Sequence, residues 1–137
     1  MTTAPHATGD SPSVPVRGVL AVTLSVLGNV ALVFGAGALD IAPEFGALTV
    51  PPVAVLSAAG AAGATVVYWL LSRYVTDPDR TFVRVAVVVL VLSFVPDLAL
   101  LAVDPAATPL AVVVLMVMHA VVAVASVGLL VYWRAGR

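Results

Sequence analysis

The sequence predicts an all-α fold, a membrane-spanning antiparallel four-helix bundle. Hydrophobic residues make up 62% of its 137 positions and charged residues only 9%. Soluble domains carry about 25% charged residues, so this chain cannot cover a water-facing surface. Its apolar residues form four runs, each near the ~20 residues that an α-helix needs to cross a bilayer. The runs cover roughly residues 18–39, 51–71, 83–103 and 110–133.

The first run follows a polar N-terminal segment. Residues 1–16 are rich in Thr, Ser, Pro, Ala and Gly without apolar periodicity, which predicts a disordered tail. The four-helix domain then covers residues 17–134. The small residues Ala36-Gly37-Ala38 resemble a signal-peptide cleavage site, but the run before them exceeds the usual ~7–15-residue apolar core. We therefore favour a retained span, and cleavage would leave three spans in the same orientation.

Prolines and acidic residues mark where the later runs begin. Pro51 opens the second run, because the missing N–H of proline costs least in the first helical turn. The Asp-Pro-Asp segment that starts at Asp77 is a turn signal between the second and third runs. Pro105 and Pro109 delimit the loop before the fourth run. The short loops predict helices that pack side by side in sequence order.

Charged residues predict the orientation of the bundle. All six basic residues are arginines, and they lie before the first run, around the turn between the second and third, and after the fourth. The charged residues of the other two loops are all acidic. Because short Arg-rich loops stay cytoplasmic, we expect a multi-pass protein of the cell membrane with both termini cytoplasmic. The arginines are Arg17, Arg73, Arg80, Arg84, Arg134 and Arg137, and the loop acids are Asp40, Glu44 and Asp104.

Composition and motifs exclude several functional classes. A net charge of −1 provides no basic patch for nucleic acid. The absence of cysteine excludes disulfides and thiolate chemistry. The sequence has neither a His-Glu-x-x-His zinc motif nor a Gly-rich phosphate loop. We therefore assign no catalytic residue, no cofactor and no metal ligand, and expect the lipid bilayer as the principal partner.

Polar side chains inside the runs are the candidate functional residues, because ionisable groups are costly in hydrocarbon. Counted from the outer helix ends at ~1.5 Å per residue, Asp97 lies about 9 Å deep, His119 about 14 Å and Asn29 about 15 Å. They form one layer in the outer half of the bilayer. Ser93 is one helical turn from Asp97, and Pro96 removes a backbone bond that would kink the helix and open space beside Asp97.

Each candidate also has a purely structural interpretation. Asn29 is consistent with an interhelical hydrogen bond worth about 0.6 kcal/mol. Asp97 is consistent with an acid that is protonated or that extends toward the outer surface. His119 is consistent with a residue that only holds the third and fourth helices together. Gly60 and Gly63 indicate close packing of the second helix rather than hinges.

Two segments of the third and fourth runs carry a family resemblance. Leu90-Val91-Leu92-Ser93-Phe94-Val95-Pro96-Asp97 and Leu115-Met116-Val117-Met118-His119-Ala120-Val121-Val122-Ala123 resemble the domain of unknown function 6069 family. Those are small four-span actinobacterial membrane proteins. The resemblance implies the fold and the membrane location, and it raises the interest of Pro96 and His119. It implies no activity, because the family has none assigned.

For function, the sequence favours an integral membrane protein with a binding or scaffold role. We expect helix–helix self-association through small-residue faces, giving a possible homo-oligomer. The alternative is a proton-linked small-solute transporter that uses a buried Asp97 and His119 pair. A weaker alternative is a membrane enzyme acting on a lipid-soluble substrate. The sequence does not specify a small-molecule ligand.

Overall fold

The computed structural model describes residues 12–133, and within them the chain forms long α-helices and no strand. Four helices are long and apolar enough to cross a membrane. This confirms the predicted all-α, membrane-spanning four-helix bundle. The helices are α1 Val14–Ala38, α2 Val50–Tyr74, α3 Pro78–Val103 and α4 Pro109–Val127, with the short 3-10 helix η1 Gly46–Leu48 and the π-helix η2 Gly128–Tyr132.

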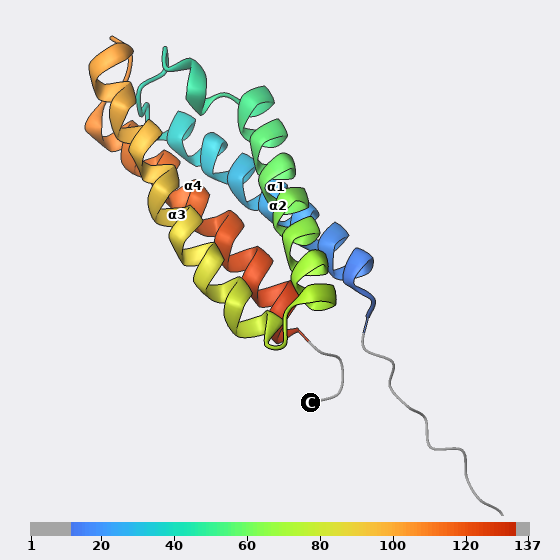
Figure 1. The fold of residues 1–137 in the computed structure, drawn as a ribbon. Helices are drawn as coiled ribbons and strands as arrows, with labels where there is room; N and C mark the ends of the chain where they lie inside the picture. The colour runs from blue at the N-terminus through green and yellow to red at the C-terminus, as the bar shows by residue number, and fades with distance from the viewer. Residues whose placement is uncertain (1–11, 134–137) are drawn as a thin grey trace, which may run out of the picture.

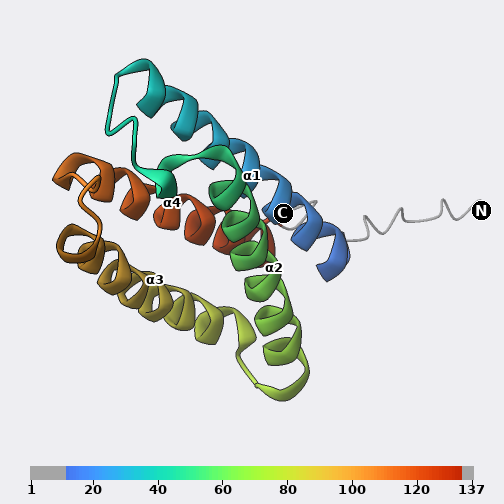
Figure 2. The ribbon, with the colours of Figure 1, turned by 90° about the horizontal axis from the view of Figure 1, so that it is seen from above.

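The helices alternate in direction, and α4 has the central position. The start of α1, the turn between α2 and α3, and the end of α4 lie at one end of the bundle (Figure 1). Seen along the other axis, α1 and α3 lie on opposite sides of α4, and α2 crosses beside α1 (Figure 2). Both α2 and α4 contact all three other helices, and the most extensive packing is that of α1 on α2.

The first helix begins earlier than the sequence predicted. The predicted tail of residues 1–16 falls partly outside the described residues, but Val14 to Val16 are helical. Pro15 lies in the first turn, where its missing N–H removes no helical bond. The Arg17 N–H donates to the carbonyl of Ser13 at 3.1 Å, so the helix is already formed where the first span was expected to start.

The turn between α2 and α3 is shorter than the sequence predicted. α2 continues to Tyr74 and α3 begins at Pro78, so helix replaces much of the stretch expected as loop between residues 71 and 83. Asp77 is the N-cap of α3, and its Oδ1 accepts from the Arg80 N–H at 3.3 Å. The Asp-Pro-Asp segment therefore starts a helix, because an N-cap acid followed by proline satisfies the exposed donors of the first turn.

Large side chains fill the two ends of the bundle, and small or polar ones fill the middle. One apolar cluster gathers around Phe45 and Met118 at the end with η1. The other gathers around Tyr68, Phe82 and Leu130 at the opposite end. Between them, the buried positions are mostly small or polar. These are Ala21, Ser25, Asn29, Ser57, Ala61, Ala125 and Ser126.

Small residues also allow α1 and α2 to approach closely. A Cβ atom added at Gly18 would lie 2.3 Å from Thr65 Cγ2 and 2.8 Å from Thr65 Oγ1. Real Cβ atoms do not approach other heavy atoms so closely, so glycine at this position sets the separation of the two helices.

Candidate functional site

Asn29 is a buried hydrogen-bonding centre that joins three helices. Its side chain is 2% exposed. Its Nδ2 donates to the hydroxyl of Ser57 on α2 at 2.8 Å and to the carbonyl of Met118 on α4 at 3.1 Å. Such a donor must be paired in hydrocarbon, since an unsatisfied polar group there is costly. The Asn29 bonds therefore fix the register of α1 against both neighbours.

Asp97 and His119 form a contact between α3 and α4. The Asp97 Oδ2 lies 3.0 Å from the Nδ1 of His119. The side chain of Asp97 is 8% exposed, whereas that of His119 is 42% exposed. The carboxylate thus lies inside the bundle, while part of the imidazole ring reaches its outer surface.

The geometry around the ring assigns its hydrogens. His119 Nδ1 lies 2.9 Å from the carbonyl oxygen of Leu115, and a carbonyl oxygen can only accept. Hydrogen-bond geometry is met at Leu115 and not at Asp97 Oδ2, so the Asp97 contact is an electrostatic one beside the Nδ1–H.

The structure divides the five candidate residues into separate environments. Asn29 binds the carbonyl of Met118, whereas the next residue, His119, turns toward α3. Ser93 is half-buried and donates to the carbonyl of Leu90 in its own helix at 2.6 Å. Pro96 is exposed. The residues predicted from depth to form one layer therefore form two separate sites. The Asn29 centre and the Asp97–His119 contact lie on different faces of α4.

Two grooves on the described residues lie away from Pro96, beside which the sequence predicted an opening. α3 continues as an α-helix through Pro96. One groove, of about 290 Å³, lies between α1 and α2, and the other, of about 490 Å³, lies where α1 meets the loop before η1. Asp97 and His119 are two potential metal ligands, but no group of three or more His, Cys, Asp or Glu side chains forms within residues 12–133.

A second polar centre, around Arg17, was not identified from the sequence as a site. Arg17 is 9% exposed, and its guanidinium donates to the carbonyl of Leu130 in η2. The guanidinium carbon lies 5.5 Å from the centre of the Tyr68 ring, a cation–π distance. The Tyr68 hydroxyl donates to Asp79 Oδ1 at 2.7 Å, which connects α1, α2, α3 and η2 in one cluster.

The Arg17 cluster supplies a hydrogen-bond donor to the backbone carbonyls at the end of η2, inside the protein. In η2 the Trp133 N–H bonds the carbonyl of Gly128 at 2.8 Å, one residue further back than in an α-helix. Carbonyls in a last turn need other donors, and the guanidinium provides one at Leu130. The sequence does contain a clue, because Arg17 continues the i, i+4 series of Ala21, Ser25 and Asn29 on one face of α1.

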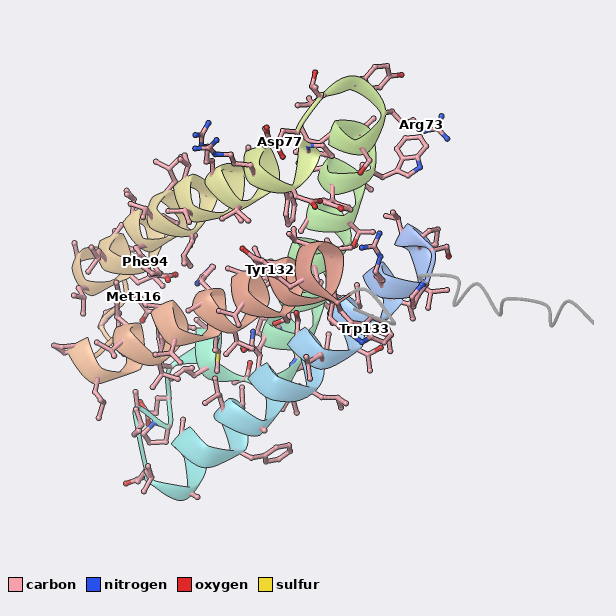
Figure 3. The ribbon with its side chains drawn as sticks, turned by 90° about the horizontal axis from the view of Figure 1, so that it is seen from below. Arg73, Asp77, Phe94, Met116, Tyr132 and Trp133 are labelled. Atoms are coloured by element: carbon pink, nitrogen blue, oxygen red, sulfur yellow. The ribbon has the colours of Figure 1, made fainter. Side chains whose placement is uncertain are left out.

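Aromatic and charged residues mark the end of the bundle that contains this cluster. Arg73 stacks on Trp69 with its guanidinium carbon 4.1 Å from the ring centre. Figure 3 shows Arg73 and Asp77 at the turn between α2 and α3, away from Phe94 and Met116 further along α3 and α4. Side chains of this kind are typical of the membrane–water interface.

Comparison with known proteins supplies the family. The model of a family of unknown function, DUF6069, matches residues 9–136. The chain belongs to this family. The DUF6069 resemblance predicted from the third and fourth runs is therefore confirmed, and the match extends over nearly the whole chain. No curated protein and no solved structure is significantly similar to this DUF6069 protein. Its four apolar helices make it a multi-pass integral membrane protein.

Proposed function

We propose that this protein is a membrane-embedded binding or scaffold protein that self-associates through one face of α2. The supporting observation is the composition of that face. Its exposed positions include Ala59, Ala62 and Gly63. A Cβ atom added at Gly63 would meet no atom within 4 Å, whereas one added at Gly60 would meet Val122 Cγ1 of α4 at 3.5 Å. Gly63 was interpreted from sequence as a close-packing position, but within one chain nothing packs on it.

This face differs from the exposed side of α3 in the size of its residues. The exposed side of α3 carries large residues such as Val88, Leu92 and Val95. In lipid, helix association relies on close backbone approach rather than on hydrophobic burial, and small residues four positions apart permit that approach. Ala59 and Gly63 have this spacing and are both exposed, so this face of α2 can approach a second copy of the chain closely.

The distribution of charge supports an orientation with both termini cytoplasmic in the cell membrane. Arg17, Arg73 and Arg84 lie toward the end of the bundle that contains the start of α1 and the α2–α3 turn (Figure 1). The opposite loops carry Asp40 and Asp104 without a basic residue. Arg-rich short loops are retained on the cytoplasmic side, so we place the Arg-containing end there.

The test is the oligomeric state of Gly63→Leu in lipid bilayers. We expect the wild-type protein to form dimers or larger assemblies in single-molecule photobleaching, and Gly63→Leu to shift toward the monomer. Gly37→Leu is the matched control, since a Cβ atom there also meets no atom within 4 Å. A monomeric wild-type protein, or equal association of the two variants, would refute the proposal.

A proton-linked transporter is the second candidate function, and the 3.0 Å contact of Asp97 with His119 favours it. A buried carboxylate beside an imidazole can exchange one proton between two states. Proton flux into liposomes that is lost in Asp97→Asn and retained in the loop variant Asp104→Asn would support this function. Flux that is absent from the wild-type protein, or equal in both variants, would refute it.

A further inference from the structure

We propose that the groove between α1 and α2 binds one acyl chain of an anionic phospholipid, whose phosphate lies on Arg73. Five α1 residues between Pro15 and Thr23 line one side of this groove, and Ala62 and Thr65 of α2 line the other. The groove shares only Ala62 with the self-association face of α2, and the proposal does not depend on self-association.

The groove presents an apolar lining to the membrane. Its two hydroxyl groups are already bonded inside their own helices, because Thr23 donates to the carbonyl of Val19 at 2.9 Å and Thr65 to that of Ala61 at 2.8 Å. The lining therefore requires no polar partner from the occupant. In a bilayer the molecule that surrounds such a surface is lipid, so hydrocarbon fills the groove.

The dimensions of the groove suit an extended hydrocarbon chain. From Pro15 to Thr23 the groove follows α1 for about 12 Å, close to the ~15 Å of hydrocarbon in one leaflet. Its volume is about 290 Å³. A helix 10–12 Å in diameter would occupy more than about 900 Å³ over the same length. The groove is therefore too narrow to seat a helix of a second copy, whereas one acyl chain fits it.

Arg73 places a positive charge beyond one end of the groove. Trp69 and Arg73 follow Thr65 at successive i+4 positions, so the three residues lie on one face of α2. Gly18 packs against Thr65 and the two helices are antiparallel, so the Arg73 end of α2 lies beside the Pro15 end of the groove (Figure 1). Figure 3 shows Arg73 on the side of α2 away from α3.

The charge of Arg73 is available to a lipid. Arg73 is exposed, and within residues 12–133 it forms no ion pair. Its guanidinium carbon lies 4.1 Å from the centre of the Trp69 ring, one helical turn nearer the groove. Tryptophan prefers the headgroup level of a bilayer, and a guanidinium matches the oxygens of a phosphate. A lipid with its chain in the groove thus has its headgroup at the level of Arg73.

The experiment is native mass spectrometry of the full chain, delipidated in detergent and titrated with phosphatidylglycerol or phosphatidylcholine. We expect the wild type to bind the anionic phosphatidylglycerol about fivefold more tightly, the effect of one arginine near an anionic lipid surface. Arg73→Gln should abolish this preference. Arg84→Gln is the matched control, since it removes an exposed arginine of α3 and should leave the preference unchanged.

A second pair of variants tests the groove itself. Val19→Phe places a larger side chain in the groove and should weaken the binding of both lipids, whereas Val88→Phe on the exposed face of α3 should not. Equal affinity of the wild type for the two lipids, or equal effects within either pair of variants, would overturn the proposal. Loss of dimer without loss of lipid in Val19→Phe would assign the groove to a second copy and would overturn it as well.

Discussion

Replacement of Asn29 by alanine tests the polar centre that joins α1, α2 and α4. The substitution removes the bonds to Ser57 Oγ and to the Met118 carbonyl, at 2.8 and 3.1 Å. Interhelical bonds in membrane proteins average about 0.6 kcal/mol each, and the two acceptors left behind lose a buried partner. We therefore expect Asn29→Ala to lower the free energy of unfolding by about 1–2 kcal/mol.

A double-mutant cycle isolates the bond to α2. Unfolding free energies in bicelles would be measured for Asn29→Ala, Ser57→Ala and the double variant, with a coupling energy near 0.6 kcal/mol expected, roughly the average for such bonds. Ser93→Ala is the control, because its hydroxyl bonds only its own helix and its loss should change stability little. Zero coupling, or a Ser93→Ala cost equal to that of Asn29→Ala, would refute the reasoning.

Three further substitutions test the packing and orientation of the bundle. Gly18→Ala should destabilise the fold by about 1–3 kcal/mol through overpacking, while Gly37→Ala, with no neighbour within 4 Å, should be tolerated in the same unfolding assay. Tyr68→Phe removes the hydroxyl that donates to Asp79, and we expect a loss of about 1 kcal/mol in thermal or chemical unfolding. Glu44→Cys should react with an impermeant thiol reagent in intact cells if its loop faces outward; labelling only after lysis would contradict that orientation.

The sequence predicted the number and length of the helices because hydrocarbon leaves the backbone few alternatives. A span must satisfy every N–H and C=O internally, so run length and apolar content determine the fold. Helix ends were less predictable, since they depend on short-range chemistry. Asp77 starts α3 by accepting the Arg80 N–H, although the same Asp-Pro-Asp pattern also occurs in turns.

The candidate site was only partly predictable because depth along a helix says nothing about direction around it. Asn29, Asp97 and His119 were placed in one layer from their distance to the helix ends. In the structure Met118 and His119 face different neighbours, so Asn29 and Asp97 lie on different sides of α4. That division depends on which helices pack on which side of α4, and a single sequence does not specify this packing.

Arg17 was missed for a different reason. An arginine just before an apolar run is the usual mark of a cytoplasmic boundary, so it was interpreted only as a topological signal. The helix starts earlier than predicted, which brings Arg17 inside α1 and under the carbonyl of Leu130. The irregular backbone of η2 that receives it has no recognisable sequence pattern.

Single-cysteine cross-linking at Gly63 tests the central claim, that α2 is the face on which copies of this protein meet. The chain has no cysteine, so Gly63→Cys carries one thiol, and disulfides form only when Cα atoms come within about 7 Å. In oxidised membranes we expect a covalent dimer for Gly63→Cys and none for Val88→Cys on the exposed face of α3. A monomeric Gly63→Cys protein, or equal cross-linking at both positions, would contradict the account.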